Sequence, residues 1–148
     1  MININNSNDP DYRYKMNELK IKIIKRDTVL ENIDIVAQQI NTPVNILIKY
    51  IGCKLGCAVK NNKLNGVKPS EDINKALFCF IDAFIVCKSC GIPEINYELE
   101  NKKVVGVCLA CGNLHQENNF DKINNKFYGV IASHLVDNKW PISGGCIK

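Results

Sequence analysis

Four cysteines in the C-terminal half of the chain have the spacing of a metal site. They form two pairs, Cys87 with Cys90 and Cys108 with Cys111, and each pair encloses two residues. A pair with this spacing can point both sulfurs at one ion from a single tight turn. Four thiolates suit a tetrahedral, closed zinc site that leaves no coordination position for a substrate. We therefore predict one structural Zn²⁺ ion, held by these four side chains.

The alternative chemistry for such a pair is thiol–disulfide exchange of the thioredoxin type. A thioredoxin-like site uses one motif at the junction of a strand and a helix, whereas this sequence has two motifs at the spacing of a zinc ribbon. Gly91 and Gly112 follow the two pairs, where a tight knuckle can require a positive φ. Strand-like segments at 95–99 and 103–107 would form a hairpin that brings the pairs together. The metal hypothesis is therefore preferred.

The other cysteines and a nearby histidine are not assigned to the metal. Cys79 falls in a predicted helix, where we interpret it as a small apolar side chain. Cys53 and Cys57 have no second pair to complete a site, so we interpret them as ordinary buried cysteines. His115 is interpreted as a surface residue, because four thiolates already complete the zinc site.

The composition of the chain is that of an ordinary globular protein. Of its 148 residues 46% are hydrophobic and 23% are charged, and no apolar run approaches the roughly 18 residues that cross a bilayer. The N-terminus lacks the basic start and apolar core of a signal peptide. We therefore expect a protein of the cytosol or nucleus, and take cytoplasmic as its localisation. In such reducing surroundings eight cysteines indicate metal rather than disulfides. The formal net charge of +4 permits contact with nucleic acid or an acidic partner.

The residues that precede the metal site are predicted to form a small α/β core, which must position it. Apolar residues alternate with lysines at 19–23, which predicts a strand, and 28–30 is the expected return strand after a turn at 25–27. Apolar residues then recur at helical spacing from 33 to 40, and again in a second helix with Thr42 as its N-cap and Gly52 as its C-terminal stop. A hairpin is expected around Asn61 and Asn62.

The strongest periodic signal is a third helix that runs directly into the first metal pair. Ser70 is the predicted N-cap, and the apolar stripe extends from Ile73 to Phe84. The stretch 113–126 reads as irregular, and a last amphipathic helix is expected around Phe127 to Leu135. We therefore predict an α+β fold whose α/β core is followed by a Cys₄ zinc ribbon and a C-terminal helix. The predicted organisation is listed by range: a flexible arm at 1–11, the core at 12–86, the ribbon at 87–112, and the C-terminal helix and tail at 113–148.

Four motifs in order along the chain carry a family resemblance. They are Tyr-Arg-Tyr-Lys-Met at 12–16, Lys-Tyr-Ile-Gly-Cys-Lys-Leu-Gly at 49–56, the block at 84–94 that includes the first cysteine pair, and Cys-Leu-Ala-Cys-Gly at 108–112. Together they cover about 12–136. On these motifs the sequence resembles the N-terminal domain of eukaryotic translation initiation factor 5, within the initiation factor 2 beta and initiation factor 5 superfamily, whose small core and ribbon the predicted fold matches.

The resemblance implies a function in translation initiation. The initiation factor 5 domain is not an enzyme itself, but activates GTP hydrolysis by initiation factor 2, bound with GTP and initiator tRNA on the small ribosomal subunit and its RNA. By resemblance, Arg13 would be an arginine finger that neutralises charge on the transferring phosphoryl group. Lys49 matches a supporting lysine of the family, and Lys15 and Lys49 are candidate nucleic-acid contacts. Arginine at position 13 is notable because 17 of the 19 basic residues are lysine, which lacks the planar guanidinium.

Two departures from the family pattern bear on that function. Family members have a Gly-Asn-Gly-x-Lys-Thr loop between the first two strands, whose lysine supports activation, and here 25–28 reads Lys-Arg-Asp-Thr. Lys25 or Arg26 would have to substitute for the loop lysine. Family members also continue into an acidic linker and a C-terminal helical-repeat domain that recruits other initiation factors, and we expect those contacts to be absent from these 148 residues.

Two alternative functions remain open from the sequence. The beta subunit of initiation factor 2 shares the core and ribbon, and archaeal versions have a similar length, but they lack the Tyr-Arg-Tyr-Lys opening. The other alternative is a ribosome- or RNA-binding module, or a decoy, without an activator role. In each case we expect no membrane partner and a chain that is monomeric when free.

Overall fold

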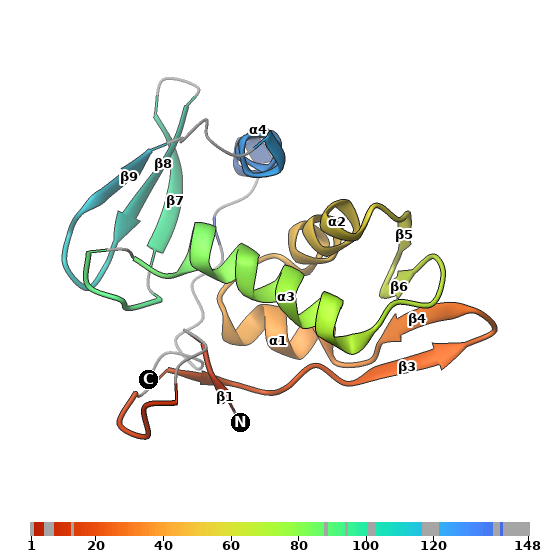
Figure 1. The fold of residues 1–148 in the computed structure, drawn as a ribbon. Coiled ribbons are helices and arrows are strands. Elements are labelled where there is room, and N and C mark those ends of the chain that lie inside the picture. The colour runs from red at the N-terminus through yellow and green to blue at the C-terminus, as the bar shows by residue number, and fades with distance from the viewer. Residues whose placement is uncertain are drawn as a thin grey trace.

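The computed structural model describes residues 2–4, 8–12, 14–87, 89–93, 95–100, 103–116, 122–137 and 140. The regular elements are helices and antiparallel sheets, so the predicted α+β class is confirmed. A four-stranded sheet and a three-stranded sheet lie at opposite ends of the molecule, with the helices between them (Figure 1). The strands are β1 (Ile2–Asn3), β2 (Lys15–Met16), β3 (Ile21–Ile24), β4 (Asp27–Leu30), β5 (Val59–Lys60), β6 (Lys63–Leu64), β7 (Ile95–Glu100), β8 (Lys103–Cys108) and β9 (Leu114–Gln116). The helices are α1 (Ile33–Gln39), α2 (Val44–Leu55), α3 (Ser70–Phe80), the π-helix η1 (Ile81–Ile85) and α4 (Lys122–Asp137).

The N-terminal residues 2–4 differ from the flexible arm that the sequence predicts. Strand β1 pairs antiparallel with β2, and the Ile4 N–H donates to the Tyr14 carbonyl at 3.0 Å. Ile4 is only 1% exposed and belongs to the main hydrophobic cluster. The polar composition of the segment gave no sign of this buried isoleucine, because the residues that pair with the segment lie ten or more positions further along the chain.

The four-stranded sheet has the order β3-β4-β6-β5, and both of its predicted hairpins are confirmed. The turn between β3 and β4 consists of Lys25 and Arg26, because Asp27 already pairs with Ile24. Both turn residues have positive φ, at 52° and 78°, as two-residue hairpin turns require. Leu30 and Leu64 are fully buried, so one face of the sheet packs against the helical core.

Helix α2 begins and ends at residues other than those predicted. Its N-cap is Pro43 rather than Thr42, and no side chain caps it. The helix also continues past Gly52 and ends at Gly56, which has a left-handed φ of 67°. At position 52 a glycine lets the helix pack closely against Val59, since a Cβ there would lie 2.5 Å from the Val59 side chain. A left-handed C-terminal glycine is the usual stop signal, and here it lies four residues further along.

The third helix is confirmed, and its last turn is a π-helix. Pro69 is the N-cap of α3, so Ser70 is the first helical residue rather than the predicted cap. The Val86 N–H donates to the Ile81 carbonyl at 2.9 Å, a π-type i to i−5 bond. Aromatic rings then join α2 to this segment, with ring centroids 5.0 Å apart for Tyr50 and Phe80. The core of the molecule is therefore built around the end of α3.

We use the name ribbon for the three-stranded sheet together with its two cysteine turns. The ribbon packs on that core through Tyr97. The fully buried Tyr97 hydroxyl donates to the Phe84 carbonyl of η1. Gly106 lies opposite Tyr97 in the β7–β8 register, and a Cβ there would come within 2.9 Å of the Tyr97 ring and 2.8 Å of Ile95. A glycine is thus required beneath this ring. The buried cluster crosses the boundary predicted at 86 and is continuous from the helices into the ribbon.

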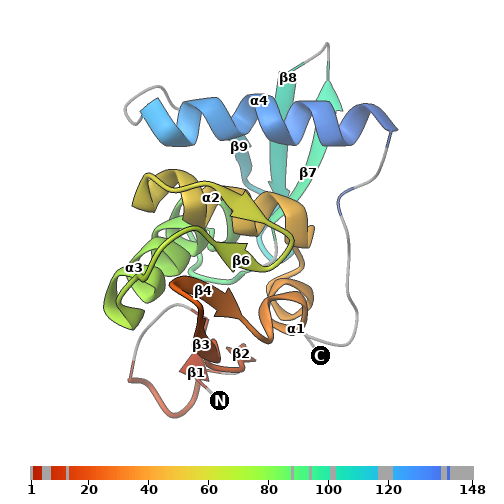
Figure 2. The same cartoon turned by 90° about the vertical axis from the view of Figure 1, so that its right-hand side faces the viewer.

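The C-terminal part contains more regular structure than the sequence suggests. Strand β9 and the first turns of α4 occupy part of the stretch predicted to be irregular. Helix α4 packs against α2 on one side and the ribbon strands on the other (Figure 2). Trp140, in the predicted C-terminal helix and tail, is buried with its ring centroid 4.9 Å from that of Tyr97. Within the described part of the chain, no helix has the length and apolarity to span a bilayer.

The close approach at Gly106 gives a test of this packing. We expect Gly106→Ala to lower the free energy of unfolding by about 1–3 kcal/mol, the usual cost of overpacking a core. Thermal denaturation of the metal-loaded protein measures the change. The matched control is Gly129→Ala in α4, where a Cβ would meet nothing within 4 Å. That control should instead stabilise the protein by about 0.5–1 kcal/mol, as alanine does in a helix. Equal effects of the two substitutions would contradict the proposed contact.

Candidate functional site

The two cysteine pairs form two knuckles with the same backbone hydrogen bonds. In the first, the Gly91 N–H donates to the Cys87 carbonyl at 2.7 Å, and in the second the Gly112 N–H donates to the Cys108 carbonyl at 2.8 Å. The N–H of the first cysteine in each knuckle also donates to the carbonyl five residues later, at 3.0 Å in both cases. Both glycines have positive φ, 73° and 80°, as the sequence predicts. The β7–β8 hairpin brings the knuckles together.

The four sulfurs form a cluster that fits a tetrahedral metal ion. All four Sγ atoms lie within 4.8 Å of one another. The Cys87 and Cys111 sulfurs are 3.7 Å apart, and those of Cys90 and Cys108 are 3.6 Å apart. A tetrahedron with Zn–S bonds of about 2.3 Å has sulfurs about 3.8 Å apart, so the donor set fits Zn²⁺ in both chemistry and spacing.

The N-terminal Tyr-Arg-Tyr-Lys motif is attached to the first knuckle. The Tyr12 hydroxyl donates to the Gly91 carbonyl at 3.1 Å, across 79 residues of sequence. Burial raises the pKa of Tyr12 to about 12, so the hydroxyl keeps its proton and remains a donor at neutral pH. The Tyr12 ring also packs edge-on against the buried Tyr14, with centroids 5.8 Å apart. Arg13 lies outside the described residues. Its neighbours Tyr12 and Tyr14 are each fixed by a hydrogen bond, to Gly91 and Ile4 respectively.

The lysines of the candidate site lie on separate elements. The Lys15 Nζ donates to the Asn3 Oδ1 at 3.0 Å, which links β2 to β1. Lys49 is exposed on α2. Its exposure leaves it accessible to a partner, whereas Lys15 also has a role within the fold.

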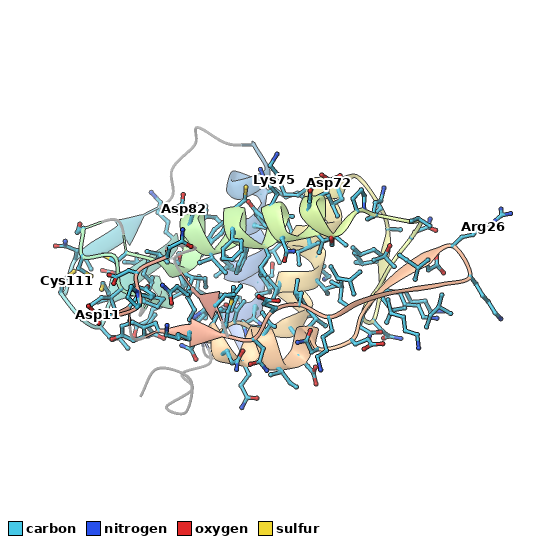
Figure 3. All side chains as sticks on the ribbon, turned by 60° about the horizontal axis from the view of Figure 1, so that its bottom comes forward. Asp11, Arg26, Asp72, Lys75, Asp82 and Cys111 are labelled. Carbon is cyan, nitrogen blue, oxygen red and sulfur yellow. The ribbon has the colours of Figure 1, made fainter. Side chains whose placement is uncertain are left out.

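Lys25 and Arg26 lie far from the N-terminal motif. Both are exposed at the tip of the β3–β4 hairpin. Figure 3 shows Arg26 at one end of the molecule, with Asp11 and Cys111 at the other end. The structure therefore does not bring these candidate loop substitutes next to the motif that contains Arg13.

Three cysteines outside the cluster, Cys53, Cys57 and Cys79, are less buried than the sequence interpretation assumed. Cys79 is exposed, because it faces away from the core side of α3. Cys53 and Cys57 are half-buried, and the Cys53 sulfur accepts a hydrogen bond from the Lys126 Nζ at 3.7 Å. The side chain of His115 lies outside what the structure describes. Among the described residues only the four predicted cysteines form a potential metal cluster.

A basic surface on the four-stranded sheet was not recognised from the sequence. Lys22 and Lys63 both pair with Val29 across neighbouring strands, so they share the face directed away from the helices. Lys60 lies directly opposite Lys63 on that face. We use the name lysine face for Lys22, Lys60 and Lys63 together with the two exposed residues of the adjoining hairpin tip, Lys25 and Arg26. The alternation of lysines at 20 and 22 was a signal for it, but the strand order that collects the others was not predictable.

Comparison with known proteins supports the motif resemblance. A family model described as the domain found in initiation factors 2B and 5 matches residues 4–114. The chain belongs to this family. Relatives of this initiation-factor domain include proteins named eukaryotic translation initiation factor 5. The protein from Caenorhabditis elegans is 33% identical over 114 residues, covering 70% of this chain and 26% of the relative.

Two further relatives give the same picture. The initiation factor 5 of Drosophila melanogaster is 36% identical over 124 residues, covering 75% of this chain and 27% of the relative. That of Saccharomyces cerevisiae is 32% identical over 123 residues, covering 75% of this chain and 30% of the relative. The initiation-factor domain described here thus spans less than a third of the length of these relatives.

The cysteine cluster leads to a prediction about metal content. We expect the purified protein to contain about one zinc ion per chain, as a closed tetrahedral site requires, measured by elemental mass spectrometry. Cys87→Ser should abolish stoichiometric zinc, because it removes a buried ligand. The matched control is Cys79→Ser, which changes an exposed cysteine outside the cluster and should leave the metal content unchanged. Zinc-free wild-type protein, or full zinc in Cys87→Ser, would refute the assignment.

Proposed function

We propose that this initiation-factor domain acts in the cytoplasm in translation initiation, as an activator of GTP hydrolysis by initiation factor 2. In this proposal Arg13 is the arginine finger, and the partners are initiation factor 2 with GTP and initiator tRNA on the small ribosomal subunit and its RNA. The family membership and the names of the relatives support the general role. The observation that carries the specific role is the attachment of the Tyr12–Tyr14 segment to the first knuckle.

That attachment suits a finger because a catalytic group acts best when it is positioned beforehand. Tyr12 is bonded to the Gly91 carbonyl, and the Tyr14 carbonyl accepts the hydrogen bond from Ile4. The backbone on each side of Arg13 is therefore held, which reduces the conformational freedom that the segment would lose in the complex. The guanidinium could then stabilise charge that develops on the transferring phosphoryl group.

The metal has a supporting role in this proposal. A Zn²⁺ ion bound by four thiolates would fix the shape of both knuckles, and the carbonyl that holds Tyr12 belongs to one of them. Zinc supplies structure rather than Lewis-acid chemistry when all four positions are filled by protein. The ribbon would thus fix the position of the N-terminal Tyr-Arg-Tyr-Lys motif.

The role of Arg13 can be tested with two substitutions. Arg13→Ala should remove most of the stimulated GTP hydrolysis in reconstituted pre-initiation complexes, since arginine fingers contribute roughly 10³- to 10⁵-fold to the rate. Arg13→Lys should lose nearly as much, because an ammonium lacks the planar fork. Binding of both variants to the complex should change far less than the rate, because a finger acts mainly on the transition state.

Arg26→Lys is the matched control, because Arg26 is the other arginine of the chain and lies at the far end of the molecule from Asp11. It should retain the wild-type rate. Full activity of Arg13→Lys would reduce the role of Arg13 to electrostatic attraction. A wild-type chain that binds the complex without stimulating hydrolysis would refute the activator function.

A second candidate function is ribosomal or other RNA binding, and the lysine face favours it. Like charges placed directly opposite each other in a sheet are destabilising, yet Lys60 and Lys63 have this arrangement. Lys25 and Arg26 both have positive φ, a conformation that costs non-glycine residues about 1–2 kcal/mol each. Ile23 nearby is 48% exposed. A polyanion would offset the charge repulsion on this face, which is why RNA is the favoured ligand.

The hairpin tip allows stability and RNA binding to be separated. We expect Lys25→Asn/Arg26→Gly to raise the free energy of unfolding by about 1 kcal/mol, because Asn-Gly relieves the strain of positive φ. The same change should weaken binding to small-subunit RNA and lower the slope of log affinity against log salt by about 1–2, as the loss of two phosphate contacts predicts. Thermal denaturation and fluorescence anisotropy at several salt concentrations measure the two effects.

The control is Lys103→Gln/Lys126→Gln, which removes the same net charge from two exposed lysines outside the lysine face. Its RNA affinity should stay close to that of the wild type. Equal loss of affinity in both double variants would mean that net charge alone, rather than the lysine face, attracts the RNA.

A further inference from the structure

A groove of about 740 Å³ runs along α3 and η1, and none of its lining residues belongs to the cysteine cluster or the lysine face. Its apolar part is formed by Ile4 of the N-terminal segment and by Phe78, Ile81 and Val86. Phe78 and Val86 are half-buried, so they remain partly available to a ligand. The remaining lining residues are listed separately: Glu71, Asp72, Asn74, Lys75, Cys79 and Asp82.

The groove is acidic in a chain that is basic overall. Three carboxylates and one lysine line it, while the whole chain has a formal charge of +4. Figure 3 shows Asp72, Lys75 and Asp82 spaced along α3 and its continuation. Within the described part of the chain, no ion pair neutralises these carboxylates. The negative charge is therefore available to a cationic partner.

The backbone of the groove is also unusual at one end. Ile81 and Asp82 belong to the π-helix η1, and single π-turns within helices occur often at functional sites. On this segment Asp82 is exposed, while Phe84 is fully buried. An acidic side chain therefore lines the groove where the helix ends.

We propose that this groove binds a basic, amphipathic segment of a partner protein. The lining extends from residue 71 to residue 86, which corresponds to about 22 Å of helix and about four turns of a partner helix laid beside it. Apolar side chains of the partner would contact Phe78 and Val86, and its lysines or arginines would meet the carboxylates on the rim. This is the usual arrangement by which an amphipathic helix lies in a groove.

Charge complementarity selects this occupant over the other classes. Nucleic acid and anionic lipid would be repelled by the carboxylates that line the groove. A second copy of this chain would have to present its lysine face, which is a sheet surface and not an amphipathic segment. The lysine face and the acidic groove therefore suit partners of opposite charge, which can be bound at the same time.

The test is an NMR titration of the ¹⁵N-labelled, zinc-loaded chain with a defined probe. The probe is a synthetic 16-residue peptide of lysine and leucine, with leucines at helical i, i+3, i+4 spacing. Shift changes should be confined to α3, η1 and Ile4. Asp82→Lys should weaken binding about five- to tenfold, and Lys75→Glu should tighten it by a similar factor, as reversal of a surface ionic contact predicts.

Two controls separate the groove from general electrostatics. Glu98→Lys reverses an exposed acid on β7 outside the groove and should leave the affinity within about twofold of the wild type. A peptide of the same composition without helical spacing should bind markedly more weakly. The proposal is overturned if the shifts fall elsewhere, if Lys75→Glu does not tighten binding, or if an RNA oligonucleotide shifts the groove residues instead.

Discussion

The hydrogen bond from the Tyr97 hydroxyl to the Phe84 carbonyl fixes the ribbon against the helical core. It is buried and lies in the last turn of η1, where backbone carbonyls commonly run out of intrahelical donors. Cys87 follows three residues later, so the bond sets where the first knuckle begins. Gly91 of that knuckle then holds Tyr12. The position of the N-terminal motif thus depends on a tyrosine in the second half of the chain.

This dependence explains which features were predictable from the sequence. The metal ligands were predictable because two spaced pairs constrain geometry locally, and the third helix was predictable because its apolar period is strong. Gly52 and Gly56 show the limit, since both are glycines near a helix end and only packing against Val59 distinguishes them. The bond from Tyr12 to Gly91 joins residues 79 positions apart, and no local pattern encodes such a contact.

The distribution of charge was likewise set by topology. The lysines on β3, β5 and β6 are scattered in the sequence, and the order β3-β4-β6-β5 places them on one surface. The acids of α3 lie on a different element, whose apolar side is occupied by the core. A modest net charge of +4 therefore conceals two strongly charged surfaces of opposite sign. Composition alone indicated only that contact with nucleic acid or an acidic partner was permitted.

The two-residue turn at Lys25 and Arg26 has a consequence for how the hairpin can change over evolutionary time. A turn of this length fixes the pairing register of β3 with β4. A slip of one residue would exchange the even-numbered and odd-numbered side chains of β3, sending Lys22 toward the helices and Ile21 into solvent. The length of the turn therefore decides which alternate side chains of β3 face solvent, and with them which residues form the charged surface. Only insertions in the turn that keep the same side chains of β3 directed to solvent would leave the lysine face intact.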